Sequence, residues 1–145
     1  MSTTHVICPE CGAKNAIPAE RLNDKPRCGK CKTLLFNAHP VALDQAGFNR
    51  HVSGNDIPVL VDFWAPWCAP CRAMAPAFES AAAQLEPGMR LAKLNTEEEQ
   101  GIGARYNIRS IPTLVMFHKG REVARQSGAM AAGDIVRGAR AQLQG

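Results

Sequence analysis

The stretch WAPWCAPCRAMAP, residues 64–76, places Cys68 and Cys71 with two residues between them. The same spacing occurs in two more pairs, which with the first account for all six cysteines: Cys8 with Cys11, and Cys28 with Cys31. A Cys-x-x-Cys pair can bind a metal or carry out redox chemistry. The residues around each pair decide between these two uses.

The pair in residues 64–76 lies between a strand pattern and a helix pattern. The apolar, β-branched run 57–65 is typical of a buried central strand, and residues 71–85 have apolar side chains at helical spacing. Cys68 would then lie at the N-terminal end of a helix, where free N–H groups and the helix dipole stabilise a thiolate. A thiolate at neutral pH is a nucleophile, which favours redox chemistry over two reduced core cysteines.

The rest of the second half alternates between helix and strand patterns. We expect helices over 42–52, 71–85, 97–108 and 134–145, strands over 57–65 and 89–95, and a hairpin over 113–128 that turns at Gly120. The last helix should bury Ile135, Val136, Ala139 and Leu143. The order α-β-α-β-α-β-β-α predicts an α/β fold.

Composition excludes several classes of protein. The 145 residues have a formal net charge of +4, too small to indicate nucleic-acid binding by itself. The sequence contains no apolar run of transmembrane length, and MSTTHVICPECGAKN has no secretory signal pattern. We therefore expect a cytoplasmic protein whose cysteines are thiols, metal ligands or catalytic groups rather than structural disulfides.

Residues 1–36 contain few large apolar side chains, so a module of this size needs a metal or disulfides to fold, and we assign 37–145 to a second domain. The spacing C-x2-C-x16-C-x2-C predicts one structural or regulatory Zn²⁺ bound by four thiolates, Cys8, Cys11, Cys28 and Cys31. A disulfide-stapled domain and an iron site are the alternatives, because four sulfurs do not select the metal. His5 or His39 could replace one ligand, and otherwise we assign all four histidines to the surface. Gly12 and Gly29 should relax the turns so that N–H groups reach the sulfurs.

Asp62 is unusual because it lies in the middle of the apolar run VLVDFW. Burying a carboxylate is unfavourable unless it has a partner or a function, and burial should raise its pKa toward neutrality. It could then accept a proton from the Cys71 thiol through a water. Alternatively, Asp62 is structural and is satisfied by the backbone or by Lys93 on the neighbouring strand; both can hold together.

FWAPWCAPC, Pro76 and SIPTL (110–114) together resemble the thioredoxin family, over residues 40–145. With the four-cysteine module in front, the chain resembles the zinc-containing bacterial thioredoxin 2 type. The resemblance implies a central mixed sheet of five strands flanked by four helices, with the fifth strand near 37–41. The linker Ala69-Pro70 departs from the family's usual Gly-Pro, which puts the redox potential in doubt.

The resemblance also implies roles for individual residues. Cys68 matches the attacking thiol, Cys71 the resolving thiol and Asp62 the buried acid beneath them. The substrate-binding residues would be Trp67, Ile111, Pro112 and Gly128. Pro112 matches a cis-proline, and a cis bond there would leave the backbone of Ile111 free to pair with an extended substrate peptide.

These features predict an enzyme that reduces protein disulfides and binds no organic cofactor. The resemblance implies that an NADPH-dependent thioredoxin reductase recycles it. We expect a monomer whose partners are disulfide-containing proteins and the reductase, with no nucleic acid or membrane. One alternative is a zinc-ribbon binding module on a thioredoxin scaffold. The other is a disulfide oxidant or isomerase.

Overall fold

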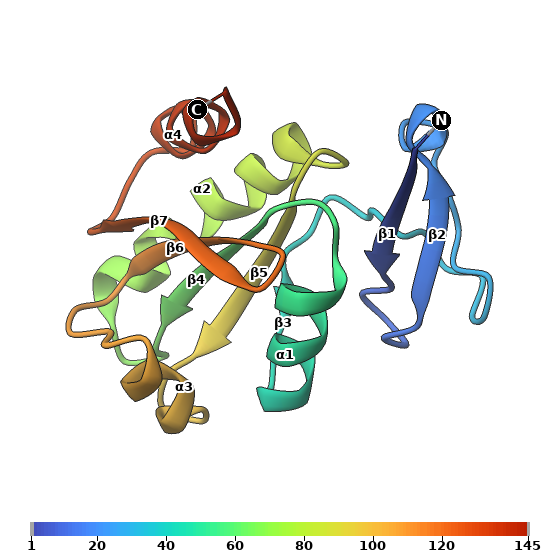
Figure 1. Ribbon diagram of the computed structural model, residues 1–145. Coiled ribbons are helices and arrows are strands. Elements are labelled where there is room, and N and C mark those ends of the chain that lie inside the picture. Colours follow the sequence, from blue (N-terminus) through green and yellow to red (C-terminus); the bar gives the residue numbers. More distant parts are fainter. Residues whose placement is uncertain (1, 145) are drawn as a thin grey trace.

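The computed structural model describes residues 2–144 and contains two sheets (Figure 1). The larger sheet has the strand order β3-β5-β4-β6-β7. The first three of these strands are parallel, and β6 and β7 are antiparallel, so the sheet is mixed as expected. Its strands are β3 (Val41–Ala42), β4 (Val59–Trp64), β5 (Arg90–Asn95), β6 (Thr113–His118) and β7 (Arg121–Ser127).

Four helices cover the two faces of this sheet, and each face has its own apolar cluster. The helices are α1 (Gln45–Gly54), α2 (Ala69–Leu85), α3 (Gln100–Arg105) and α4 (Ala132–Gln144). Met74 and Phe78 of α2 pack with Ile135 of α4 on one face. Phe48 of α1 and Ile102 of α3 belong to the cluster on the other. None of the helices in the described residues has the length and apolar character needed to cross a membrane.

The central strand β4 is buried over most of its length, as its sequence predicts. Successive side chains of a strand point to opposite faces. Val61 and Phe63 accordingly pack in the cluster with α1, while Leu60 packs in the cluster with α2. Asp62 has the same parity as Leu60. The strand therefore directs a carboxyl group toward the α2 side of the sheet.

Two predicted helices begin three residues later than the sequence pattern suggested. The helix expected over 42–52 begins at Gln45, because β3 pairs with β5 and the Asp44 carboxylate then caps the helix by accepting from Gly47 N at 2.7 Å. The helix expected over 97–108 is confined to α3. Asn95 Oδ1 accepts from Glu97 N at 2.9 Å, which holds the chain in a turn before the helix begins.

The remaining differences lie in the last part of the chain. Helix α4 buries three of its four predicted core residues, but Leu143 is exposed because it lies in the last turn. The hairpin turns at Lys119 and Gly120, both with positive φ, the geometry of a two-residue type I′ turn. The fifth strand, expected near 37–41, is β3 and has only two residues.

The second sheet is a hairpin of β1 (Thr3–Ile7) and β2 (Lys14–Pro18), which the sequence did not indicate, followed by the 3₁₀ turn η1 (Ala19–Arg21). Figure 1 places it beside α1. It has a small apolar cluster of its own, formed by Val6, Cys8, Cys28 and Leu35. Two of these four are cysteines, so little apolar surface holds this segment together.

The assignment of all four histidines to the surface was wrong for His51, which is 2% exposed in α1. Its Nδ1 accepts from Asn55 Nδ2 at 3.1 Å when the ring is neutral. Burial, reinforced by the nearby Arg90 and Arg50, lowers the pKa of His51 to about 3. A neutral imidazole is therefore part of the core, on the same face of α1 as Phe48 and Val52.

Candidate functional site

Cys68 and Cys71 form a disulfide at the start of α2. Cys68 is the N-cap residue, and its Sγ accepts from the backbone N–H of Cys71 at 3.2 Å. Pro70 occupies the first turn, where its missing N–H leaves no hydrogen bond unmade. The helix dipole and this N–H both favour negative charge on Cys68 Sγ. The geometry suits a cysteine that alternates between thiolate and disulfide.

Asp62 lies in β4, next to the strand end that leads into the cysteine pair, and is 1% exposed. Neither carboxyl oxygen has a hydrogen-bond partner among the described residues. Burial raises the pKa of Asp62 to about 7, and the charge of Lys93 opposes part of this rise. At neutral pH the group can therefore both hold and release a proton.

Lys93 does not satisfy Asp62 in the way that the structural alternative requires. The two residues are register partners on β4 and β5. Yet the Lys93 ammonium lies 4.4 Å from the centroid of the Trp64 ring, in a cation–π contact. Lys93 thus acts on Asp62 through its charge alone and leaves both carboxyl oxygens free.

The structure brings together the residues predicted to bind substrate. Ile111–Pro112 is a cis peptide bond. Cys68 Sγ lies 3.7 Å from Ile111 O, and Gly128 N donates to Pro112 O at 2.9 Å. Gly128 has φ +98°, and a Cβ added there would meet no atom within 4 Å. Cys68, the Ile-Pro loop and Gly128 therefore lie side by side at one surface, where Gly128 is exposed while Cys68, Cys71 and Pro112 are largely buried.

Trp67 borders the same surface and is 65% exposed, a large fraction for an aromatic side chain. It lines a hollow of about 390 Å³ together with Ile108, Arg109 and Ile111. An exposed aromatic ring beside a hollow next to the redox pair offers apolar contact to a second protein.

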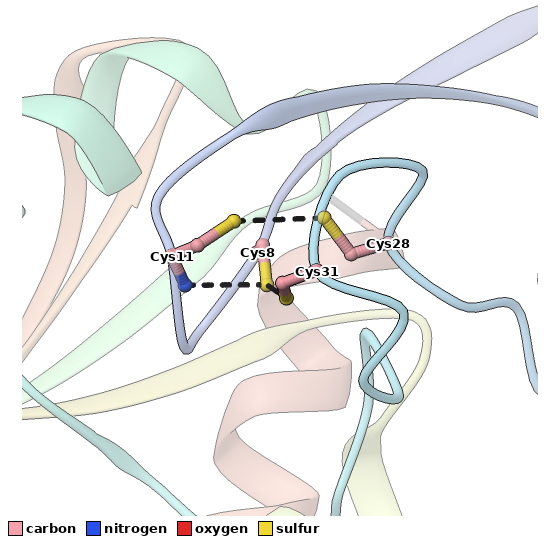
Figure 2. Close-up of side chains that lie close together, drawn as sticks. All are labelled: Cys8, Cys11, Cys28 and Cys31. Carbon is pink, nitrogen blue, oxygen red and sulfur yellow. Dashed lines mark hydrogen bonds between the residues drawn. The ribbon is translucent and has the colours of Figure 1, made fainter.

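The other four cysteines, far apart in sequence, form a single cluster (Figure 2). All four sulfurs lie within 4.8 Å of one another. The pairs Cys8–Cys31 and Cys11–Cys28 are each separated by 3.6 Å between sulfurs. A Zn–S bond of about 2.3 Å in a tetrahedron separates sulfurs by about 3.8 Å, so the cluster fits a tetrahedral metal ion. His5 instead contacts Asp56 and His39 contacts Glu79, so neither is a ligand here.

Hydrogen bonds to the sulfurs favour thiolates. Glu10 N donates to Cys8 Sγ and Lys30 N to Cys28 Sγ, both at 3.4 Å. The Cys31 backbone N–H lowers the pKa of the Cys28 thiol to about 6, with further hydrogen bonds from Asn15 and Lys30. Hydrogen bonds led by that from Thr33 also lower the pKa of Cys31, so charge is favoured on Cys28 and Cys31, as zinc ligands require. The pKa of Cys11 is instead raised to about 11, because the hydrogen bond with Ala13, which lowers it, is outweighed by burial and the neighbouring thiols.

The prediction that Gly12 and Gly29 relax the turns of the two cysteine pairs is right only for Gly12. Gly12, directly after the first pair, has φ +77°, but the equivalent position after the second pair is Lys32, with φ 67°. Gly29 lies inside the second pair, and its N–H donates to Asn15 Oδ1 at 2.9 Å instead of relaxing the turn.

Comparison with known proteins agrees with both sites. The thioredoxin family model matches residues 39–141, and the family model described as "Thioredoxin 2, N-terminal", a zinc ribbon, matches residues 7–33. The chain belongs to the thioredoxin family. It is of the type that carries a four-cysteine zinc-ribbon module in front of the thioredoxin domain, and at the level of the family it is a thiol–disulfide oxidoreductase.

Individual relatives support this thioredoxin assignment. Thioredoxin C-3 of Corynebacterium nephridii is 43% identical over 139 residues, which cover 96% of this chain and 95% of the relative. A thioredoxin of the alga Porphyra purpurea is 47% identical over 85 residues, 59% of this chain and 79% of the relative. The solved structure of a mutant thioredoxin from Halobacterium salinarum NRC-1 superimposes with a TM-score of 0.65 at 29% identity, covering 72% of this chain and 91% of that one.

The sequence did not indicate several polar residues that surround the four-cysteine cluster. Asn15 Nδ2 donates to Cys28 Sγ at 3.6 Å, and the Thr33 hydroxyl lies 3.0 Å from Cys31 Sγ. These residues are in loops and an exposed hairpin, where polar side chains are common and carry no signal. Arg90 also gave no sign of its burial, because MRLAKLN contains Lys93 and Asn95 as well, and a charged residue does not stand out there as Asp62 does in VLVDFW.

Proposed function

We propose that this protein reduces disulfide bonds in other proteins through Cys68 and Cys71. The observation that carries the proposal is the place of Cys68 at the N-terminus of α2, with Cys71 N donating to its sulfur. This position stabilises the thiolate that a nucleophile needs. The comparisons support thiol–disulfide exchange in general, and the direction of reduction is our inference.

The reaction balances in two steps. The Cys68 thiolate attacks one sulfur of the substrate disulfide, forms a mixed disulfide, and displaces the other substrate sulfur as a thiolate. Asp62 accepts the proton of Cys71 through a water, and the Cys71 thiolate attacks Cys68 Sγ. The second substrate sulfur leaves, so the substrate gains two electrons and the pair becomes the Cys68–Cys71 disulfide.

The substrate's backbone is held beside Cys68 by the surface that the Ile-Pro loop forms with its neighbours. We assign contacts with substrate to Trp67, Ile111, Pro112 and Gly128. The exposed ring of Trp67 supports this role. A thioredoxin reductase would return two electrons from NADPH to the disulfide, and the partners would otherwise be disulfide-containing proteins met by a cytoplasmic monomer.

We further propose that Cys8, Cys11, Cys28 and Cys31 hold one Zn²⁺, and that the chain divides into a zinc-binding module (1–36) and a thioredoxin domain (37–145). The sulfur spacing in Figure 2 supports the metal. Bound zinc would supply folding energy to a segment with a small apolar cluster, and it plays no part in the exchange reaction. Metal analysis of the purified protein should give one zinc per chain.

The decisive experiment follows the turbidity of insulin as its disulfides are reduced by dithiothreitol. Wild type should accelerate precipitation strongly, Cys68→Ser should not, and Cys8→Ser should retain most of the rate. Activity that survives Cys68→Ser would move the search to the zinc module. A redox titration separates the second alternative, since a strongly oxidising potential for the pair would indicate an oxidant.

A further inference from the structure

Arg90, the first residue of β5, is fully buried although it has no place in the exchange reaction. A guanidinium group is one of the most unfavourable groups to remove from water, and it persists inside a protein only with charged or hydrogen-bonding partners. Burial lowers the pKa of Arg90 below its ordinary value, and Glu86 opposes the shift. The residue therefore depends on the groups around it.

Most of these partners come from the N-terminal segment. Arg90 Nη2 donates to Leu35 O at 2.7 Å and to Ile7 O at 3.1 Å. Its guanidinium lies 4.8 Å from the centroid of the Phe36 ring. On the thioredoxin side, Nη1 donates to Glu86 Oε2 at 3.2 Å. One nitrogen thus joins two backbone carbonyls that are far apart in sequence.

Both carbonyls belong to residues close in sequence to the four-cysteine cluster. Ile7 directly precedes Cys8, and Leu35 follows the second cysteine pair. Leu35 N also donates to Pro26 O at 3.0 Å, just ahead of Cys28. Arg90 therefore fixes the distance between the strand that leads into the first pair and the segment that brackets the second.

Ile7 has further contacts with the thioredoxin domain. Its N–H donates to Asn55 Oδ1 at 2.8 Å, and Asn55 is 1% exposed and held by the neutral ring of His51. Its side chain packs on Gly54, where an added Cβ would lie 2.7 Å from Ile7 Cδ1. The residue before the first cysteine is thus held at its N–H, its carbonyl and its side chain.

We propose that Arg90 is a positioning residue of the metal site, which preorganises the two cysteine pairs and couples metal retention to the folded thioredoxin domain. When the metal leaves, the two carbonyls loosen and Arg90 loses neutral acceptors that it needs inside the protein. Coupling of this kind is reciprocal, so the same contacts that slow metal loss make the thioredoxin domain more stable when metal is bound.

The test uses the full chain with the double substitution Arg90→Met and Glu86→Gln, which avoids leaving a buried carboxylate without its partner. Gln keeps an oxygen to accept from Ala38 N, as Glu86 does at 2.8 Å. The control is Arg121→Met, an exposed arginine that also begins a strand. Zinc release to a chromogenic chelator should be about tenfold faster in the double variant and unchanged in the control.

A second readout measures the coupling itself. Both tryptophans, Trp64 and Trp67, lie in the thioredoxin domain, so their fluorescence during urea unfolding reports that domain. Under reducing conditions, removal of zinc should lower the urea midpoint of wild type, and at least half of this shift should disappear in the double variant. An unchanged release rate, or an undiminished zinc-dependent shift, overturns the proposal.

Two milder substitutions keep the test decisive if the double variant does not fold. Arg90→Lys places its three N–H donors on one nitrogen, where arginine serves the three acceptors from both Nη1 and Nη2, and Asn55→Ala removes the hydrogen bond to Ile7 N. Unchanged zinc release in both would overturn the proposal. The inference rests on the proposed zinc binding by the four cysteines. A wild-type chain that contains no zinc would refute that assignment. Wild type and variants that all bind zinc and release it at equal rates would refute only the role of Arg90. Neither readout measures disulfide reduction.

Discussion

Replacing Asp62 by Asn should stabilise the oxidised protein, and by more at high pH than at low pH. Asp62 has no hydrogen-bond partner for either carboxyl oxygen among the described residues, and burial raises its pKa from 3.8 to about 7. An acid whose pKa is higher in the folded state binds its proton more tightly there. The contribution of Asp62 to the free energy of unfolding is therefore highest below about pH 4, falls between pH 4 and 7, and is constant above pH 7.

The size of the effect follows from the two pKa values. One pKa unit corresponds to about 1.4 kcal/mol, so ionisation of Asp62 costs the folded state about 4 kcal/mol in full. About 2–3 kcal/mol of this falls between pH 5 and pH 8. The amide that replaces the carboxyl group in the variant does not titrate, and all other groups are shared, so the difference between the two proteins isolates this one carboxyl.

Urea unfolding of both proteins at pH 5 and pH 8, followed by tryptophan fluorescence, measures this difference. The advantage of Asp62→Asn should grow by about 2–3 kcal/mol over that range. A difference that stays constant with pH would show that the pKa of Asp62 is not raised, and would remove the basis for its part as a proton acceptor. Asp44→Asn, at an exposed cap, serves as a control and should show no such growth.

Two further outcomes are expected. Asp44→Ala removes the bond to Gly47 N and should lower the free energy of unfolding by about 1 kcal/mol, measured in urea against Gln45→Ala. Hydrogen peroxide should oxidise the four clustered thiolates to disulfides and release zinc, and the nearest pairs are Cys8–Cys31 and Cys11–Cys28. Mass spectrometry detects the disulfides and a zinc assay the released metal. Disulfides within residues 8–31 at constant bound zinc would contradict the prediction.

The main features of the fold could be predicted because they depend on local patterns. The run around Val61 is apolar and β-branched whichever strands flank it, and the apolar spacing of Met74, Phe78 and Leu85 marks one face of a helix. These patterns persist because burial of the same side chains stabilises the fold. Spacing and surroundings likewise predict two separate groups of cysteines, and the structure clusters the four N-terminal ones and pairs Cys68 with Cys71.

What could not be predicted depends on partners distant in the chain. The two residues of β3 are a strand only because β5 lies beside them. His51 lies on the buried face of α1 with Phe48 and Val52, but a histidine at such a position gives no reason to expect burial; its neutral ring is held there by Asn55. Leu143 has the right spacing for the core but lies past the end of the packed surface. Lys93 contacts the Trp64 ring instead of Asp62, a choice between two neighbours that sequence does not resolve.

The distance along the chain between Ile7 and Arg90 has a consequence for biosynthesis. The two residues are 83 positions apart, and at about 5–20 residues per second β5 leaves the ribosome roughly four to seventeen seconds after β1. All four clustered cysteines are made within this interval. A two-stranded hairpin is marginally stable at best in water, so the zinc that we propose for the four cysteines would help to order this segment before its anchor exists. We therefore expect the nascent hairpin to capture its metal first and to dock later, when the rest of the chain has been made.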